Sequence, residues 1–247
     1  MTAPVFLVDP GALDGSPSRL TLGGPEGRHA VCVRRLQPGE EIVLADGAGR
    51  GAYGTVAALD GRDSLHVDVR TLRDEPEPAA RITVIQALPK GDRGELAVET
   101  MTEAGVDAVV PWAAARCVTQ WRGDRGAKSL AKWRSAAREA AKQARRLRFP
   151  SVAELMTTRQ IAALLAGADF AGVLHEEGSV PLATAPLPPT GSFVLVVGPE
   201  GGITPDELAV FAGAGAPPYR LGPTVLRTST AGVAATALLL TRTGRWS

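Results

Sequence analysis

The stretch LVVGPEGGIT, residues 195–204, ends one structural element and begins another within ten residues. Its first three residues, 195–197, are aliphatic and typical of a buried strand. Four of the next five residues are glycine or proline, and they surround one carboxylate, Glu200. A segment that can begin a helix follows at Pro205. A strand that ends in a corner with so few side chains predicts an α/β domain in which backbone groups approach a ligand closely.

Two other segments have the same character. The strand-like run VLHEEG ends at Gly178, and the run LGPTVLRTSTA has its glycine at Gly222. Ligands of parallel α/β sheets bind beyond the carboxyl ends of the strands, so neighbouring strand ends of this kind would form one pocket. A single glycine-rich corner is more often an ordinary tight turn. Three such corners in one domain favour a ligand site.

The second part of the chain alternates between strand-like and helix-like runs. Strands are expected in RITVIQAL, VDAVVPW, FAGVLHE, SFVLVVG and PPYRLG. Helices are expected between and after them, at residues 92–105, 128–147, 159–166, 205–212 and 230–242. Gly105 is expected to end the first helix and Pro150 the second. This alternation predicts a parallel sheet with helices on both faces.

The first part of the chain has a different pattern. In residues 1–72, short apolar runs such as PVFLV and EIVLADG end in turn residues, and Asp60-Gly61 marks a hairpin. With one short helix at residues 29–36, this pattern predicts a small β-barrel. The polar run RDEPEPAA, residues 73–80, carries two prolines and is typical of a linker. Residues 81–247 then form the second domain.

Composition narrows the class of protein. Hydrophobic residues make up 45% of the 247, which is enough for a packed core, and no apolar run approaches the roughly 20 residues that cross a bilayer. No secretory signal is visible, and two cysteines are too few for a disulfide framework. A soluble cytoplasmic protein without membrane contact is therefore expected. The three histidines lie far apart, and no metal site is predicted. The sequence also lacks a P-loop, a dinucleotide-binding glycine motif and a serine-hydrolase elbow.

Charge is unevenly distributed along the chain. The net charge is only +1, but residues 128–148 carry eight lysines and arginines against the single acid Glu139. A basic face on a nearly neutral protein predicts a polyanion partner such as nucleic acid. The alternative is an ordinary solvated helix face.

The motifs together resemble a known family. VVGPEGGITPDEL followed by RLGPTVLRTSTAG resembles the C-terminal signature of the SPOUT-superfamily methyltransferases that modify uracil N3 in small-subunit ribosomal RNA. ALPKGDRGELAVETMTEAGVDAVVPWAAARCV, AAREAAKQARRLRFP and HAVCVRRLQPGEEIVLADGAG resemble the central block, basic helix and N-terminal module of the same family. The resemblance covers nearly the whole chain. It implies a PUA-like RNA-binding N-terminal β-barrel and a C-terminal SPOUT α/β domain with a deep trefoil knot, in a homodimer.

The resemblance also implies a cofactor, S-adenosylmethionine (SAM), bound in the knot by backbone groups of three loops. The residues expected to bind it are Leu174, His175, Glu176, Val197, Gly198, Pro199, Glu200, Gly201, Gly202, Leu221, Gly222, Val225, Leu226 and Thr228. Glu200 is expected either to cap the following helix or to face the pocket, with a structural role favoured. Ser229 stands where the family often has glutamate, and it is expected to cap the last helix. The family's arginine beside the first phenylalanine is absent from APVFLVD.

The implied reaction is methylation of uridine N3 in 16S rRNA of the small ribosomal subunit. It requires loss of a weakly acidic imide proton, an unpaired base and stabilisation of negative charge on the uracil. Arg227, directly after the cofactor loop, is the expected catalytic residue, and no residue is assigned as general base. The residues expected to bind RNA are Lys90, Arg93, Arg116, Lys142, Arg145, Arg146 and Arg148. Two alternatives stay open: a SPOUT methyltransferase acting on ribose 2′-OH of another RNA, and a non-catalytic RNA-binding ribosome-assembly factor.

Overall fold

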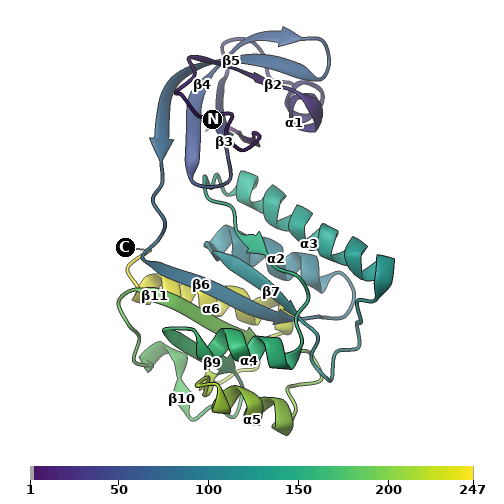
Figure 1. Cartoon of the computed structure of the whole chain (residues 1–247), viewed down its shortest axis with the longest axis vertical. Helices are drawn as coiled ribbons and strands as arrows, with labels where there is room; N and C mark the ends of the chain where they lie inside the picture. Colours follow the sequence, from purple (N-terminus) through teal and green to yellow (C-terminus); the bar gives the residue numbers. More distant parts are fainter. Residues whose placement is uncertain (1–2, 247) are drawn as a thin grey trace. The chain divides into compact units, whose positions relative to one another are not determined.

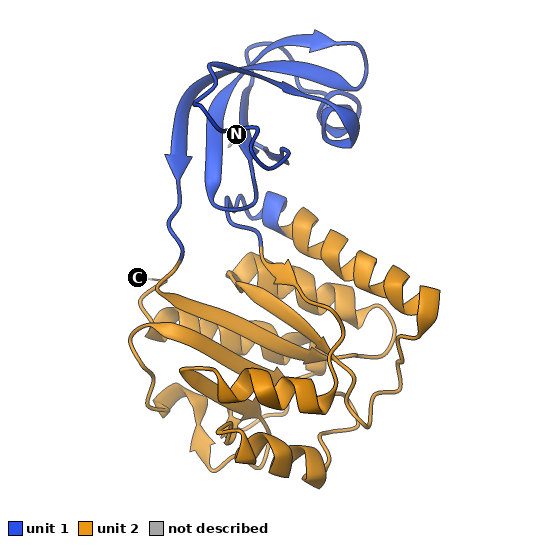
Figure 2. Cartoon of the chain, viewed as in Figure 1, with its two compact units in different colours: residues 1–77, 141–149 blue, residues 78–140, 150–247 orange. Residues whose placement is uncertain are grey.

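The computed structural model describes residues 3–246, and the chain forms two compact units (Figure 2). Unit 1 comprises residues 1–77 and 141–149, and unit 2 comprises residues 78–140 and 150–247. Among the described residues, no helix is both long and apolar enough to cross a membrane. The expected linker is shorter than 73–80, because strand β5 continues to Asp74 and β6 begins at Ala80.

Unit 1 is built on a five-stranded sheet in the order β1-β3-β4-β5-β2. The strands are β1 (Val5–Leu7), β2 (Arg19–Leu22), β3 (Glu41–Ala45), β4 (Arg50–Asp60) and β5 (Ser64–Asp74). The β4–β5 hairpin confirms the turn predicted at Asp60-Gly61, and its inward side chains, such as Val56 and Val67, join the core of unit 1. The short helix starts earlier than expected, as α1 (Gly24–Arg28) followed by a π-helical turn, η1 (His29–Val33).

Helix α3 (Gly123–Gln143) differs from its prediction at both ends. It starts five residues before Lys128, and it stops at Gln143 instead of continuing to Leu147. Arg145 adopts a left-handed φ of 57°, and the backbone N–H groups of Arg145 and Arg146 donate to the carbonyls of Lys142 and Ala141. This is the hydrogen-bond pattern of a Schellman motif, which ends a helix regardless of a later proline.

The segment after α3 packs into unit 1. The backbone N–H of Phe149 donates to Gly47, and that of Gly49 donates to the carbonyl of Leu147, whose side chain is buried. Lys142 is also buried and forms an ion pair of 2.8 Å with Glu26. The basic run expected on one helix is therefore divided between the helix and a segment of unit 1.

Unit 2 confirms the predicted α/β class. Its seven-stranded sheet has the order β10-β12-β9-β11-β6-β7-β8, and every registered pair is parallel. The strands are β6 (Ala80–Ala87), β7 (Ala108–Trp112), β8 (Ser151–Val152), β9 (Phe170–Leu174), β10 (Val180–Pro181), β11 (Gly191–Val197) and β12 (Pro218–Arg220). The other helices are α2 (Arg93–Ala104), α4 (Thr158–Ala166), the 3-10 turn η2 (Leu182–Thr184), α5 (Pro205–Gly213) and α6 (Thr228–Arg242). Figure 1 shows α2 and α6 side by side behind the sheet, with α4 in front of it.

Local signals in the sequence explain where these helices begin and end. Gly105 has a left-handed φ of 116° and ends α2, as predicted. Thr157 and Thr204 form capping boxes at the starts of α4 and α5. Beyond α6, Arg245 makes a bidentate ion pair with Asp107, with nitrogen–oxygen distances of 2.6 and 3.2 Å. This pair attaches the chain after α6 to the residue before β7, so the C-terminal end of α6 is fixed to the sheet layer.

Candidate cofactor-binding site

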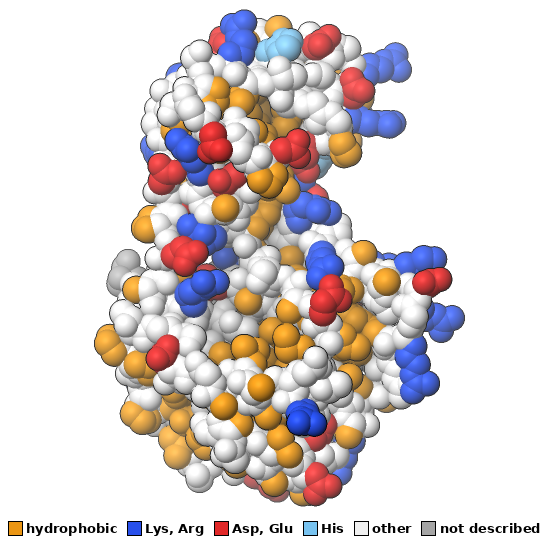
Figure 3. Space-filling view, in the orientation of Figure 1, with side chains coloured by type: hydrophobic (Ala, Val, Ile, Leu, Met, Phe, Trp, Pro, Cys, Tyr) orange, Lys and Arg blue, Asp and Glu red, His pale blue; other side chains and the backbone are white. Residues whose placement is uncertain are grey.

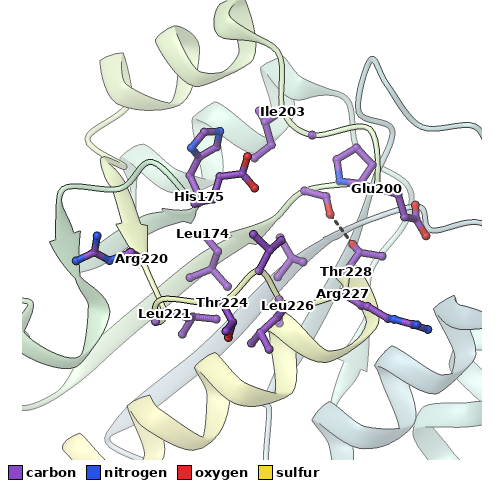
Figure 4. A pocket seen from close by; sticks show the side chains of 18 of the residues that line it. Leu174, His175, Glu200, Ile203, Arg220, Leu221, Thr224, Leu226, Arg227 and Thr228 are labelled. Atoms are coloured by element: carbon purple, nitrogen blue, oxygen red, sulfur yellow. Dashed lines mark hydrogen bonds between the residues drawn. The ribbon is translucent and has the colours of Figure 1, made fainter.

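A pocket of about 690 Å³ lies at the carboxyl ends of three neighbouring strands, β12, β9 and β11 (Figure 4). Its walls are the segments that follow β9 and β11, the end of β12 with the segment after it, the first turn of α6, and Arg93 at the start of α2. The lining residues are Arg93, Leu174, His175, Glu176, Val197, Gly198, Pro199, Glu200, Gly202, Ile203, Arg220, Leu221, Gly222, Pro223, Thr224, Val225, Leu226, Arg227, Thr228 and Ala231. The three glycine-marked corners of the sequence therefore meet in one cavity.

The loop between β11 and α5 shows why glycine recurs in it. Gly202 has a φ of 74°, a left-handed conformation that side chains with a Cβ rarely adopt. Gly201 does not line the pocket, although the sequence placed it there. A Cβ on Gly201 would lie 3.1 Å from both Cβ and the carbonyl oxygen of Arg116. Arg116 also donates to the Gly201 carbonyl at 3.1 Å, so Gly201 is the point where this loop is supported from outside.

Glu200 connects this loop to the one before α2. Its Oε1 accepts a hydrogen bond of 3.2 Å from the backbone N–H of Lys90 and lies 3.6 Å from the guanidinium of Arg93. The cap of α5 is Thr204, not Glu200. The capping role favoured for Glu200 from the sequence is therefore wrong, and Glu200 instead connects the two loops and lines the pocket.

The start of α6 forms the floor of the site. Thr228 is buried, and its hydroxyl donates a short hydrogen bond to the carbonyl of Gly198, drawn as a dashed line in Figure 4. Arg227 precedes it with an exposed side chain, which in Figure 4 lies on the same side of the pocket as Glu200. The prediction that Ser229 caps this helix is wrong, because Arg227 is the N-cap residue and Ser229 is buried inside the first turn.

The loop after β9 contributes an imidazole and a carboxylate. Nδ1 of His175 accepts a hydrogen bond of 3.2 Å from the backbone N–H of Glu177. Nδ1 carries no proton in this arrangement, so a neutral ring would present its Nε2–H as a donor. Glu176 lines the same wall.

The residues predicted to bind RNA are divided between the two units. Lys90, Arg93 and Arg116 belong to unit 2, whereas the four from the basic run belong to unit 1. Within that run Arg145 is exposed, Lys142 is buried against Glu26, and Arg148 donates to the carbonyl of Glu75 at 2.8 Å. Because Lys142 is buried and paired and Arg148 is hydrogen-bonded, both side chains are less available to bind a phosphate than the sequence predicted.

Several pocket residues were missed from the sequence. They are Ile203, Arg220 and Ala231, together with Arg93, which was assigned to RNA alone. All but Arg93 lie within three positions of a residue that was predicted, so widening each motif would have included them. Among residues 3–246, no group of three or more histidine, cysteine or acidic side chains is placed to hold a metal ion.

The lining residues fit SAM. The volume is in the range of about 300–1,000 Å³ that holds small ligands. Leu174, Leu221 and Leu226 offer apolar surface for a planar base, and Gly198 and Gly202 line the cavity without side chains. The pocket also carries carboxylates, which are compatible with a sulfonium cation.

Comparisons with known proteins agree with this geometry. Residues 75–240 match the model of an RNA methyltransferase domain, and residues 22–70 that of an RNA methyltransferase PUA domain. Ribosomal RNA small subunit methyltransferase E of Mycobacterium tuberculosis is 45% identical over 250 residues, covering 100% of this chain and 94% of the relative. The protein of the same name from Bacillus subtilis is 28% identical and covers 85% of each chain.

Two solved structures extend the likeness. A methyltransferase from Legionella pneumophila with bound SAM is 26% identical, with a TM-score of 0.86 over 98% of both chains. Ribosomal RNA small subunit methyltransferase E from Neisseria gonorrhoeae, bound to SAM, is 27% identical, with a TM-score of 0.84 over 98% of both chains.

Proposed function

This chain belongs to the family of ribosomal RNA small subunit methyltransferase E, and from that premise we propose that it methylates N3 of a specific uridine in 16S rRNA. It is a SAM-dependent RNA methyltransferase. The observation that carries the proposal is the pocket at the ends of β9, β11 and β12. Its three loops are the three glycine-containing motifs identified in the sequence. The proposal concerns the identity of the methylated nucleotide and atom, a uridine and its N3, which membership of the family does not by itself establish.

In this proposal the pocket loops hold the cofactor through their backbone. Bound SAM supplies an electrophilic methyl group. The β11–α5 loop and the segment 221–226 form its two main walls, and the start of α6 closes the site from below. We further propose that these loops are the knotted part of a deep trefoil knot. A rigid threaded chain would limit the conformational entropy that is lost when the ligand binds.

Arg227 is the proposed catalytic residue. Removal of the N3 proton leaves negative charge on the uracil ring and its carbonyl oxygens, and a fixed guanidinium beside the base stabilises that charge. Arg227 is exposed, lines the pocket and stands at the N-cap of α6, where the helix dipole adds positive potential. No side chain is assigned as the base, and in this proposal bulk water or hydroxide takes the proton. The base must reach the pocket unpaired, which favours single-stranded or flipped-out RNA.

The RNA backbone has a separate proposed contact. Exposed cations at positions 125, 128 and 132 follow helical spacing along the first turns of α3, and Figure 3 shows basic side chains at that edge of unit 2. Arg125 lies in the first turn of α3, where a cation opposes the helix dipole, so its presence there favours a role in binding. Lys90, Arg93, Arg116 and Arg145 remain proposed RNA contacts, with Arg146 and Arg148 as minor ones.

Replacing Arg125, Lys128 and Lys132 together with alanine should weaken RNA binding in a salt-dependent manner. Three lost phosphate contacts reduce the slope of log affinity against log salt by about two to three, at roughly 0.7–0.9 per contact. Filter binding of small-subunit RNA at several salt concentrations measures the slope, and SAM affinity should stay the same. Arg134→Ala is the matched control, because Arg134 lies on the same helix but is paired with Glu154 at 2.8 Å. An unchanged slope in the triple variant would identify α3 as an ordinary solvated face.

We also propose a homodimer. The half-buried side chains of Val233, Ala234, Ala237 and Leu238 form a stripe of small and apolar groups along α6. Light scattering at micromolar concentration should give about twice the chain mass of 25.6 kDa. A mass equal to that of one chain would contradict the dimer.

Since ribosomes are assembled in the cytoplasm, we propose that the protein acts there.

A strain without this gene tests the proposed target. Its 16S rRNA should lack one 3-methyluridine, and the gene on a plasmid should restore it. Loss of a ribose 2′-O-methyl group would instead favour the other class of SPOUT activity. An unchanged set of modifications would favour a non-catalytic assembly factor.

A further inference from the structure

Gln86 is a polar side chain in the core of unit 2. It lies near the end of β6 and is 0% exposed. Its Oε1 is 3.5 Å from where a Cβ on Gly232 of α6 would stand, which places the amide between the sheet and α6. Burying an amide costs free energy unless hydrogen bonds compensate, so this position needs a reason other than packing.

The Gln86 amide is oriented by its backbone neighbour. Nε2 donates to the carbonyl of Ala87 at 3.1 Å, and because a carbonyl only accepts, the nitrogen and not the oxygen must face that side. The same nitrogen reaches the hydroxyl oxygen of Thr228 at 3.3 Å. Oε1 has no hydrogen-bond partner among the described residues, so the interactions of Nε2 are the ones that hold the amide.

The Thr228 hydroxyl continues the chain of hydrogen bonds. It accepts from Gln86 and donates its only proton to the carbonyl of Gly198. Each group therefore donates a hydrogen bond to the next, from the Gln86 amide to the Thr228 hydroxyl to the Gly198 carbonyl. Gly198 is the first residue of the cofactor loop, and Thr228 follows Arg227.

We propose that Gln86 is a positioning residue for the cofactor pocket and acts through Thr228. Its amide occupies an acceptor site of the hydroxyl and so directs the hydroxyl proton to Gly198, which fixes the β11–α5 loop to the start of α6. The inference rests on the SAM site described above. In a buried site such a relay strengthens each of its bonds, and loss of one member loosens the rest.

Calorimetric titration of SAM into the purified full-length protein tests the relay without an activity measurement. Gln86→Met keeps the approximate length and removes the donor, and it should weaken SAM binding about fivefold, the size expected for one buried hydrogen bond. Gln86→Asn is a second variant in case the first does not fold: it keeps an amide that is one methylene too short to reach Thr228. It should show the same loss.

A double-mutant cycle separates positioning from general destabilisation. In a Thr228→Val background the relay is already broken, so adding Gln86→Met should change SAM affinity no further. In a Thr228→Ser background the hydroxyl remains, and Gln86→Met should again cost about fivefold. Thr236→Val is the matched control, since Thr236 is equally buried on α6 and its hydroxyl has no hydrogen-bond partner among the described residues. It should leave SAM affinity unchanged.

The outcomes are distinct. Wild-type SAM affinity in folded Gln86→Met or Gln86→Asn would overturn the inference while leaving the cofactor site in place. A full fivefold loss that persists in the Thr228→Val background would also overturn it, because Gln86 would then act by another route. Failure of the wild-type protein to bind SAM would contradict the proposed function itself.

Discussion

Replacing Arg227 with alanine is expected to slow methyl transfer about a hundredfold at saturating SAM, the effect of losing a preorganised charge-stabilising donor. The side chain is exposed at the pocket and is not part of the Gln86–Thr228–Gly198 relay, so folding should be unaffected. Single-turnover transfer to small-subunit RNA measures the chemical step. The calorimetric affinity for SAM should stay close to that of the wild type.

Arg227→Lys is the graded control. Lysine restores the charge but not the planar fork of donors, so only part of the rate should return. A wild-type rate in Arg227→Ala would remove Arg227 from the mechanism. Arg93 would then be the next candidate, because it is the pocket-lining guanidinium that contacts the cofactor loop through Glu200.

Gly202→Val should reduce SAM affinity by about five- to thirtyfold. Gly202 has a φ of 74° and lines the pocket. A β-branched residue in that conformation is strained by about 1–2 kcal/mol, and a change of 1.4 kcal/mol is tenfold in affinity. If the loop moves to relieve the strain, it also moves away from the cofactor. Calorimetry gives the affinity, and thermal unfolding shows whether the variant is folded.

Gly215→Val is matched to this variant. Gly215 has a similar φ of 83°, nothing stands within 4 Å of a Cβ placed there, and it is not a pocket residue. It should show a comparable loss of stability with unchanged SAM affinity. Equal affinities in the two variants would mean that the β11–α5 loop is not a cofactor wall.

Predictions from the sequence succeeded where structure is encoded locally. The β4–β5 hairpin, the stop of α2 at Gly105 and the alternation of strands and helices follow from turn residues and hydrophobic spacing. The end of α3 did not, because it depends on Arg145 adopting a left-handed conformation that arginine rarely takes. The packing of residues 145–149 into unit 1 decides that conformation, and periodicity carries no signal for such long-range contacts.

The same distinction between local signals and long-range contacts explains which site residues could be predicted. Motif reading located the three pocket loops, but it could not distinguish Gly202, which lines the cavity, from Gly201, which rests on Arg116. Adjacent glycines look alike in a sequence, and their roles depend on which neighbour their backbone faces. Gln86 was missed for a similar reason: it lies 142 positions from Thr228, and one glutamine inside a hydrophobic strand carries no spacing signal.

The most direct measurement uses the purified protein, small-subunit particles from a strain that lacks the gene, and SAM with a labelled methyl group. After nuclease digestion, mass analysis of the nucleosides should place the label in 3-methyluridine of 16S rRNA at one position. Label transfer should fall about a hundredfold with Arg227→Ala. Label in a 2′-O-methylated nucleoside would contradict the assignment of N3, and the absence of any transferred label would contradict the proposed reaction altogether.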